Sequence, residues 1–128
     1  MKVSLNVPAN KATLTAALSG LVAANRVLLR RNRRAPGLYA SGVRYKAEPK
    51  GKEKWQTIPQ VIAAGCGDCE DLASWRAAEL QEMGIGARAE VIRTGPKMYH
   101  AIVRLPNGRI EDPSLKLGMK KPRGRRYR

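Results

Sequence analysis

The sequence predicts one domain that contains both helices and strands, because helical segments come first and strand segments follow. Apolar residues recur at helical spacing in residues 12–29 and 69–83, whereas apolar and polar residues alternate in residues 87–93, 98–105 and 109–112. The 128 residues suffice for one domain with a modest core, and a hydrophobic content of 43% excludes a chain that is disordered throughout.

The first helix is predicted to begin after the N-cap residue Asn10 and to end near Arg33, ahead of a Pro-Gly pair. Its apolar stripe consists of Leu14, Leu18, Leu21 and Leu28. A secretory signal is the alternative interpretation, since two lysines precede apolar residues and residues 22–24 have the form of a cleavage site. The amphipathic pattern explains the segment without targeting. Polar residues interrupt it before it reaches the run of about eighteen apolar residues that a membrane span needs, so we expect no membrane partner.

The middle of the chain is predicted to be irregular except for one short helix. We expect residues 38–45 to be extended and residues 46–54 to form a polar surface loop. A short helix is expected after Thr57, with Pro59 in its first turn. The glycine-containing stretch 65–68 then breaks the chain before the next helix.

The second helix is predicted to run from Cys69 to about Met83, with Gly84 as its stop signal. Its apolar stripe consists of Leu72, Trp75, Ala78 or Glu79, and Leu80.

Charge separates a core from two basic ends. The chain has 25 Lys plus Arg and 10 Asp plus Glu, for a net charge of +15. Residues 68–112 hold eight of the acids and only six of the bases. We therefore expect an N-terminal region at 1–54 with a helix and a basic connector, a core at 55–115 and a basic tail at 116–128.

Cys69 has the position of a nucleophile. A cysteine that begins a helix lies near unpaired amides and the positive end of the helix dipole, which favour a thiolate. A nucleophilic thiol benefits from a base, and His100 is the only histidine of the chain. The imidazole needs a carboxylate on a neighbouring strand, for which Asp112 is the candidate. Glu70 and Asp71 complement the helix dipole, but as nearby anions they would tend to raise the pKa of Cys69.

The turn between the last two strands decides whether His100 and Asp112 meet. A two-residue Asn-Gly turn would put them on opposite faces of the sheet. A three-residue loop at 106–108 instead places Ile102 opposite Asp112, so that His100 and Asp112 share a face at roughly 7–8 Å between backbones. The proline suits the first position of such a loop and the glycine its left-handed position, so we expect the three-residue form.

The core of the transglutaminase-like cysteine hydrolase superfamily is similar to two stretches of this chain, GCGDCEDLASWRAAELQEMGIGARAE and YHAIVRLPNGRIEDPS. The shared pattern is Gly-Asp-Cys-x-Asp-Leu-Ala at a helix start, then His-Ala, then Asp-Pro. The resemblance implies a papain-like α+β fold, in which the cysteine-bearing helix packs on a small antiparallel sheet beside an extra N-terminal helix. It also implies a thiolate–imidazolium pair that attacks amides of a protein or peptide substrate. Cys69 would be the nucleophile, His100 the base and Asp112 the orienting carboxylate.

The same resemblance indicates where the oxyanion would bind. It would lie on the backbone N–H of Cys69 and on a side-chain donor, for which Trp55 and Gln56 are candidates by position. No metal and no cofactor is expected. Small proteins with this core and basic extensions resemble some encoded in the structural regions of tailed phages, so a virion structural or adaptor protein is the alternative function.

Other interpretations of the cysteines stay open. Cys69 would be inert as a buried structural thiol. Cys66 and Cys69 form a Cys-x-x-Cys pair, which is typical of redox motifs and of half a zinc site, whose other ligands would be His100 and Asp112. The chain lacks the βαβ context of a redox motif and the second cysteine pair of a zinc site. Two cysteines are too few for a disulfide framework, so we expect free thiols and a cytoplasmic location, or a virion.

The basic ends have three interpretations: solvated faces, contacts to nucleic-acid phosphates, or anchors to other structural proteins of a phage particle. Charge alone does not separate them. The candidate contacts are Arg30, Arg31, Arg33, Arg34, Lys120, Lys121, Arg123, Arg125, Arg126 and Arg128.

Overall fold

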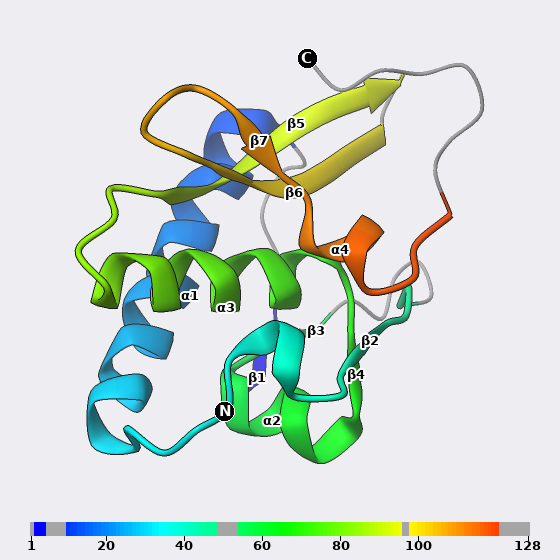
Figure 1. The fold of residues 1–128 in the computed structure, drawn as a ribbon. Coiled ribbons are helices and arrows are strands. Elements are labelled where there is room, and N and C mark those ends of the chain that lie inside the picture. Colours follow the sequence, from blue (N-terminus) through cyan, green and yellow to red (C-terminus); the bar gives the residue numbers. More distant parts are fainter. Residues whose placement is uncertain (1, 5–9, 49–53, 96–97, 121–128) are drawn as a thin grey trace.

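The computed structural model describes residues 2–4, 10–48, 54–95 and 98–120. Figure 1 shows helix α3 (Cys69–Glu82) running between a sheet on one side and a group of short elements on the other, with helix α1 (Lys11–Arg31) crossing behind it. The sheet has three antiparallel strands in the order β5 (Arg88–Gly95), β6 (Met98–Arg104) and β7 (Ile110–Glu111). The α+β prediction is confirmed.

Helix α3 is buried on nearly all sides. The apolar residues predicted to form its stripe are all buried, but they divide between two clusters instead of sharing one. One side joins a cluster with α1 and the sheet, which includes Leu18, Leu21, Val22, Ala73, Ala77, Ala78, Ala89, Ala101 and Val103. The other side joins a second cluster made of Leu38, Val43, Ile58, Val61, Leu72, Trp75 and Leu117. Helical periodicity predicts one buried face, but this helix lies between two cores, and its alanines allow α1 to approach closely.

Helix α1 begins as predicted and ends two residues early. The Asn10 side chain accepts a hydrogen bond from the Thr13 amide (2.8 Å), which confirms the N-cap. By length and composition the helix could cross a membrane, with a mean hydropathy of 1.4. The expectation that no segment is apolar enough for a membrane span is therefore wrong by the criterion of mean hydropathy. A core helix and a signal sequence pass the same test. In the structure Leu18 and Leu21 pack against α3 and the sheet.

The loop at 106–108 has the predicted three-residue form. Leu105 N–H donates to Arg109 O (2.9 Å), and Val103 lies opposite Glu111. Gly108 has φ +85°, the left-handed conformation that this loop position requires. The register on which the predicted contact between His100 and Asp112 depends is therefore confirmed.

The short elements are only partly as predicted. Helix α2 (Ile58–Ala64) follows Thr57, which forms a capping box with Gln60, as the sequence indicates. Residues 38–45 are extended only at their end, because Leu38–Ala40 forms the 3-10 turn η1. The paired elements that the sequence analysis missed are β1 (Lys2–Ser4) with β3 (Lys54–Gln56), and β2 (Arg44–Tyr45) with β4 (Cys66–Gly67). Pairs of two or three residues leave no periodic signal.

Candidate functional site

Cys69 is the first residue of α3, and the turn before it fixes that position. Asp68 is the N-cap, and its carboxylate accepts a hydrogen bond from the Cys69 amide (2.7 Å). Asp71 closes the capping box by accepting from the Asp68 amide (3.1 Å). Strand β4 holds the preceding residues against β2, so the backbone is fixed on both sides of the cysteine.

His100 and Asp112 form the predicted pair. The Nε2 atom of His100 lies 2.8 Å from Oδ2 of Asp112, and both side chains are less than 10% exposed. The other carboxylate oxygen of Asp112 accepts from the amide of Leu115, because Asp112 is also the N-cap of α4 (Pro113–Lys116). That short helix was missed, although an N-cap acid followed by proline is a recognised helix-start signal. With both oxygens engaged, the carboxylate has a fixed orientation.

The sulfur of Cys69 reaches the edge of β6 beyond the end of β7. Leu105 N–H points to that edge, since it donates to Arg109, and the strand period of two directs the Ala101 amide the same way. Strand β7 ends at Glu111, so pairing between these strands does not use the Ala101 amide. The Ala101 backbone instead lies close enough to the Cys69 sulfur to lower the pKa of the thiol.

The imidazole comes to the same edge from the other face of the sheet. Successive strand side chains point to opposite faces, so the His100 ring leaves β6 opposite the Ala101 methyl group, which packs in the core with Cys69. The ring then meets Asp112, the residue that follows β7. His100 and Asp112 therefore meet at the edge of β6 to which the Ala101 amide points.

The electrostatics of Cys69 correct one expectation. Burial raises the pKa of the thiol well above its ordinary value, and the nearby charges of Glu70 and Asp68 raise it further. The hydrogen bond from the Ala101 amide acts in the opposite direction but does not compensate. The thiolate predicted from the helix start is therefore not favoured here, because burial and two acids outweigh the dipole.

Two residues of the site were missed by the sequence analysis. Tyr45 is half-buried; burial raises its pKa, and the charges of Asp68, Glu70 and Asp112 raise it further. Asp71 is fully buried and accepts from the Gln56 amide (2.7 Å) as well as from Asp68. Burial raises the pKa of Asp71 to about 6, although these backbone hydrogen bonds lower it. The Gly-Asp-Cys-x-Asp spacing was the signal for Asp71, because it is that of a capping box.

Two of the three predicted oxyanion donors are engaged elsewhere. The Cys69 amide donates to Asp68, and the Gln56 side chain donates to Asp71 (3.3 Å). Trp55 is buried in the core and lines a cavity of about 20 Å³ beside His100, a volume that fits one water molecule. A larger groove of about 270 Å³ lies on the other side of Asp68 and is lined by Gln56 and Cys66 among others.

The four ligands considered for zinc do not form one group. Among residues with described positions, the one set of three or more potential ligands whose atoms lie within 4.8 Å of one another is Asp68, Cys69 and Glu70. Cys66 and Cys69 are both free thiols, one half-buried and one buried.

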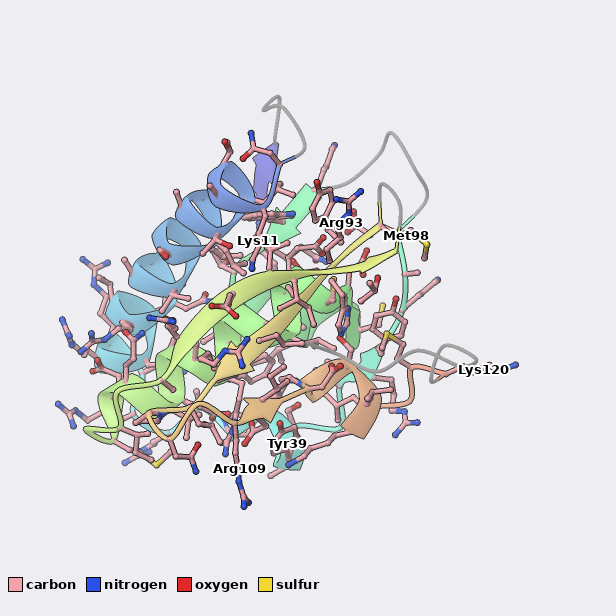
Figure 2. The ribbon with its side chains drawn as sticks, turned by 90° about the horizontal axis from the view of Figure 1, so that it is seen from above. Lys11, Tyr39, Arg93, Met98, Arg109 and Lys120 are labelled. Atoms are coloured by element: carbon pink, nitrogen blue, oxygen red, sulfur yellow. The ribbon has the colours of Figure 1, made fainter. Side chains whose placement is uncertain are left out.

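The basic residues predicted for assembly or anion binding lie at the surface where they are described. Arg31, Arg33, Arg34 and Lys120 are exposed, and the Lys120 side chain extends away from the ribbon (Figure 2). Arg30 is also exposed, but its guanidinium binds Glu82 (2.8 Å). The other predicted contacts lie outside the described residues; they are Lys121, Arg123, Arg125, Arg126 and Arg128.

Comparison of the chain with known protein families, with curated proteins and with solved structures gives no match. The function is therefore argued from the geometry of the site and the charge of the surface.

Proposed function

We propose that this chain is a cysteine hydrolase or acyltransferase with a transglutaminase-like core, acting on amides of proteins or peptides. The observation that carries the proposal is the buried His100–Asp112 pair at 2.8 Å, next to Ala101, whose backbone lies near the Cys69 sulfur. A structural histidine needs no carboxylate fixed by a second hydrogen bond, and a structural thiol has no need to begin a helix beside it.

The proposed reaction starts from the neutral thiol. His100 accepts the thiol proton as the sulfur attacks the amide carbonyl carbon, and Asp112 stabilises the resulting imidazolium. The C–N bond then breaks, His100 gives the proton to the leaving amine, and an acyl thioester stays on Cys69. Water or a second amine, deprotonated by His100, attacks the thioester and restores the thiol.

The experiment follows alkylation of Cys69 by iodoacetamide against pH, in a Cys66→Ala background that leaves a single thiol. We expect His100→Ala to be alkylated more slowly than the parent at neutral pH and to approach the parent rate only at alkaline pH, where the thiol ionises without a base. Equal profiles for the two proteins would refute the activated pair. As a control, Arg30→Gln alters an exposed ion pair with Glu82, at the opposite end of α3 from Cys69, and should leave the profile unchanged.

A second candidate is a structural or adaptor protein that binds a polyanion. It is favoured because the acidic side chains are engaged within the fold. Every acidic residue in the described part of the chain accepts a hydrogen bond or an ion pair inside the fold. Several exposed cations of the described residues take part in none of the ion pairs; they include Lys11, Arg31, Arg33, Arg34, Arg93, Arg109, Lys116 and Lys120.

Under this second candidate the protein would bind within a particle or to nucleic acid, rather than act on a peptide substrate. It predicts binding to duplex DNA with an affinity that falls steeply with salt, and weaker binding when Arg31, Arg33 and Arg34 are changed together to alanine. A flat salt dependence, or a triple variant that binds like the parent, would count against it. Cys69→Ala is the matched control, because it removes the thiol and leaves the surface charge unchanged.

A further inference from the structure

A cluster of charged and aromatic side chains lies directly beside Asp112 but belongs to three other elements. Glu111, the last residue of β7, receives two hydrogen bonds on one oxygen, from Nε of Arg76 in α3 (2.6 Å) and from the hydroxyl of Tyr39 in η1 (2.7 Å). Arg76 also binds Glu79 (3.3 Å), one turn later in α3. We call Tyr39, Arg76, Glu79 and Glu111 the latch.

Cation–π contacts connect the latch to α4. The guanidinium of Arg76 and the ammonium of Lys116 each lie 4.9 Å from the centre of the Tyr39 ring. Tyr39 lies beside α4, as Figure 2 shows from above. The latch therefore contacts the elements on both sides of Asp112, β7 before it and α4 after it.

Strand β7 is too short to fix its own end. It pairs with β6 through two residues only, and Asp112 comes after the last of them. A ladder this short gives little independent stability. The contact from Arg76 to Glu111 ties the end of β7 to α3, which carries Cys69 at its own start.

From this arrangement we infer that Arg76, Tyr39 and Glu111 are positioning residues, which hold Asp112 where it fixes the His100 ring relative to Cys69. The inference rests on the proposed function for its catalytic consequence, but the orientation of His100 can be measured without any activity. Loss of the latch leaves the end of β7 free to move, and Asp112 then no longer holds the Nε2–H form of the imidazole.

The chain supplies a matched control for this test. Glu90 binds Arg104 (2.6 Å) in the same sheet, and this ion pair is as buried as that of Glu111 with Arg76. Glu90 lies on β5, on the side of β6 away from β7, although Arg104 also donates to Gly108 O (2.9 Å) in the loop between β6 and β7. Glu111→Gln and Glu90→Gln therefore remove the same charge from comparable environments, and only the first touches the latch. Tyr39→Phe is a second test of the latch that removes one surface hydroxyl.

The first readout is the tautomer of His100, whose ring nitrogens give unambiguous ¹⁵N signals because no other histidine is present. In the neutral form of the ring the parent should hold the Nε2–H tautomer, and Glu111→Gln should show a mixture with the Nδ1–H tautomer. Tyr39→Phe should show a smaller change in the same direction, and Glu90→Gln none. Equal tautomer populations in all four proteins, or equal changes in Glu111→Gln and Glu90→Gln, would overturn the inference.

The second readout is the alkylation rate of Cys69 in the Cys66→Ala background at pH 7.5. We expect Glu111→Gln to lose about tenfold in rate, since small misplacements of a reacting group have effects of this size or larger, and Glu90→Gln to stay within about twofold. Where the parent rate does not depend on His100, the proposed function fails, and the tautomer measurement then decides the latch alone.

Discussion

Replacement of Asp71 by asparagine tests the electrostatics beneath the site. The Asp71 carboxylate is fully buried and accepts hydrogen bonds from the Gln56 amide, the Gln56 side chain and the Asp68 amide. It thereby ties β3 to the turn that positions Cys69. Asparagine keeps the shape and one acceptor but cannot ionise. Asp71→Asn therefore removes the proton equilibrium and preserves most of the packing.

The pKa of Asp71 determines the sign and size of the effect. It is raised from 3.8 to about 6, so between these values the folded protein binds more protons than the unfolded chain. Stability from this group is therefore gained as pH falls through this window and is lost as pH rises through it. Integrating between pH 7 and pH 5 with these two pKa values gives a gain of about 1 kcal/mol at the lower pH.

The assay is urea unfolding of the parent and of Asp71→Asn at pH 7 and at pH 5. The other acids titrate in both proteins, so the difference between the two changes isolates Asp71. We expect the parent to gain about 1 kcal/mol more than the variant on acidification. Equal pH dependence in the two proteins would refute the raised pKa of Asp71. A smaller gain in the free energy of unfolding of the parent than of the variant would mean that this pKa is lowered instead.

Two further changes test the fold that supports the site, both by urea unfolding at pH 7. Asn25→Ala should cost about 1–3 kcal/mol, because the buried Asn25 side chain accepts from the Ile58 amide (3.0 Å), whereas exposed Asn32→Ala should cost much less. Gly108→Ala should lower the free energy of unfolding by about 1 kcal/mol through the positive φ of this position alone. Gly20→Ala, in an exposed part of α1, is the control, and an equal or smaller loss for Gly108→Ala would refute the strained loop.

The parts of the structure that could be predicted from sequence are those with a local signal. Turn chemistry at 106–108 predicted the register, and the register predicted that His100 and Asp112 share a face. The capping residues Asn10 and Thr57 predicted where two helices begin. In each case residues close in sequence determine the geometry, so no knowledge of tertiary packing was needed.

The parts that could not be predicted depend on what packs against each element. Helix α3 has an ordinary helical pattern, and only the second cluster, formed with residues such as Leu38 and Leu117, shows why Trp75 is fully buried. Tyr45 comes near Cys69 because β2 pairs with β4, and a parallel pair of two residues has no sequence signature. The contacts of Arg76 with Glu111 and Tyr39 likewise join segments far apart in the chain.

Magnitudes explain why the start of a helix does not by itself determine the state of Cys69. A charge at a helix terminus is stabilised by about 0.3–1 kcal/mol, which corresponds to less than one pKa unit. Burial of an ionisable group shifts a pKa by up to about 3–5 units, and two acids flank this thiol. Burial therefore decides, and the thiol keeps its proton at neutral pH. Reactivity of Cys69 then depends on a base that removes that proton during attack, so the orientation of His100 by Asp112 matters more than the helix dipole.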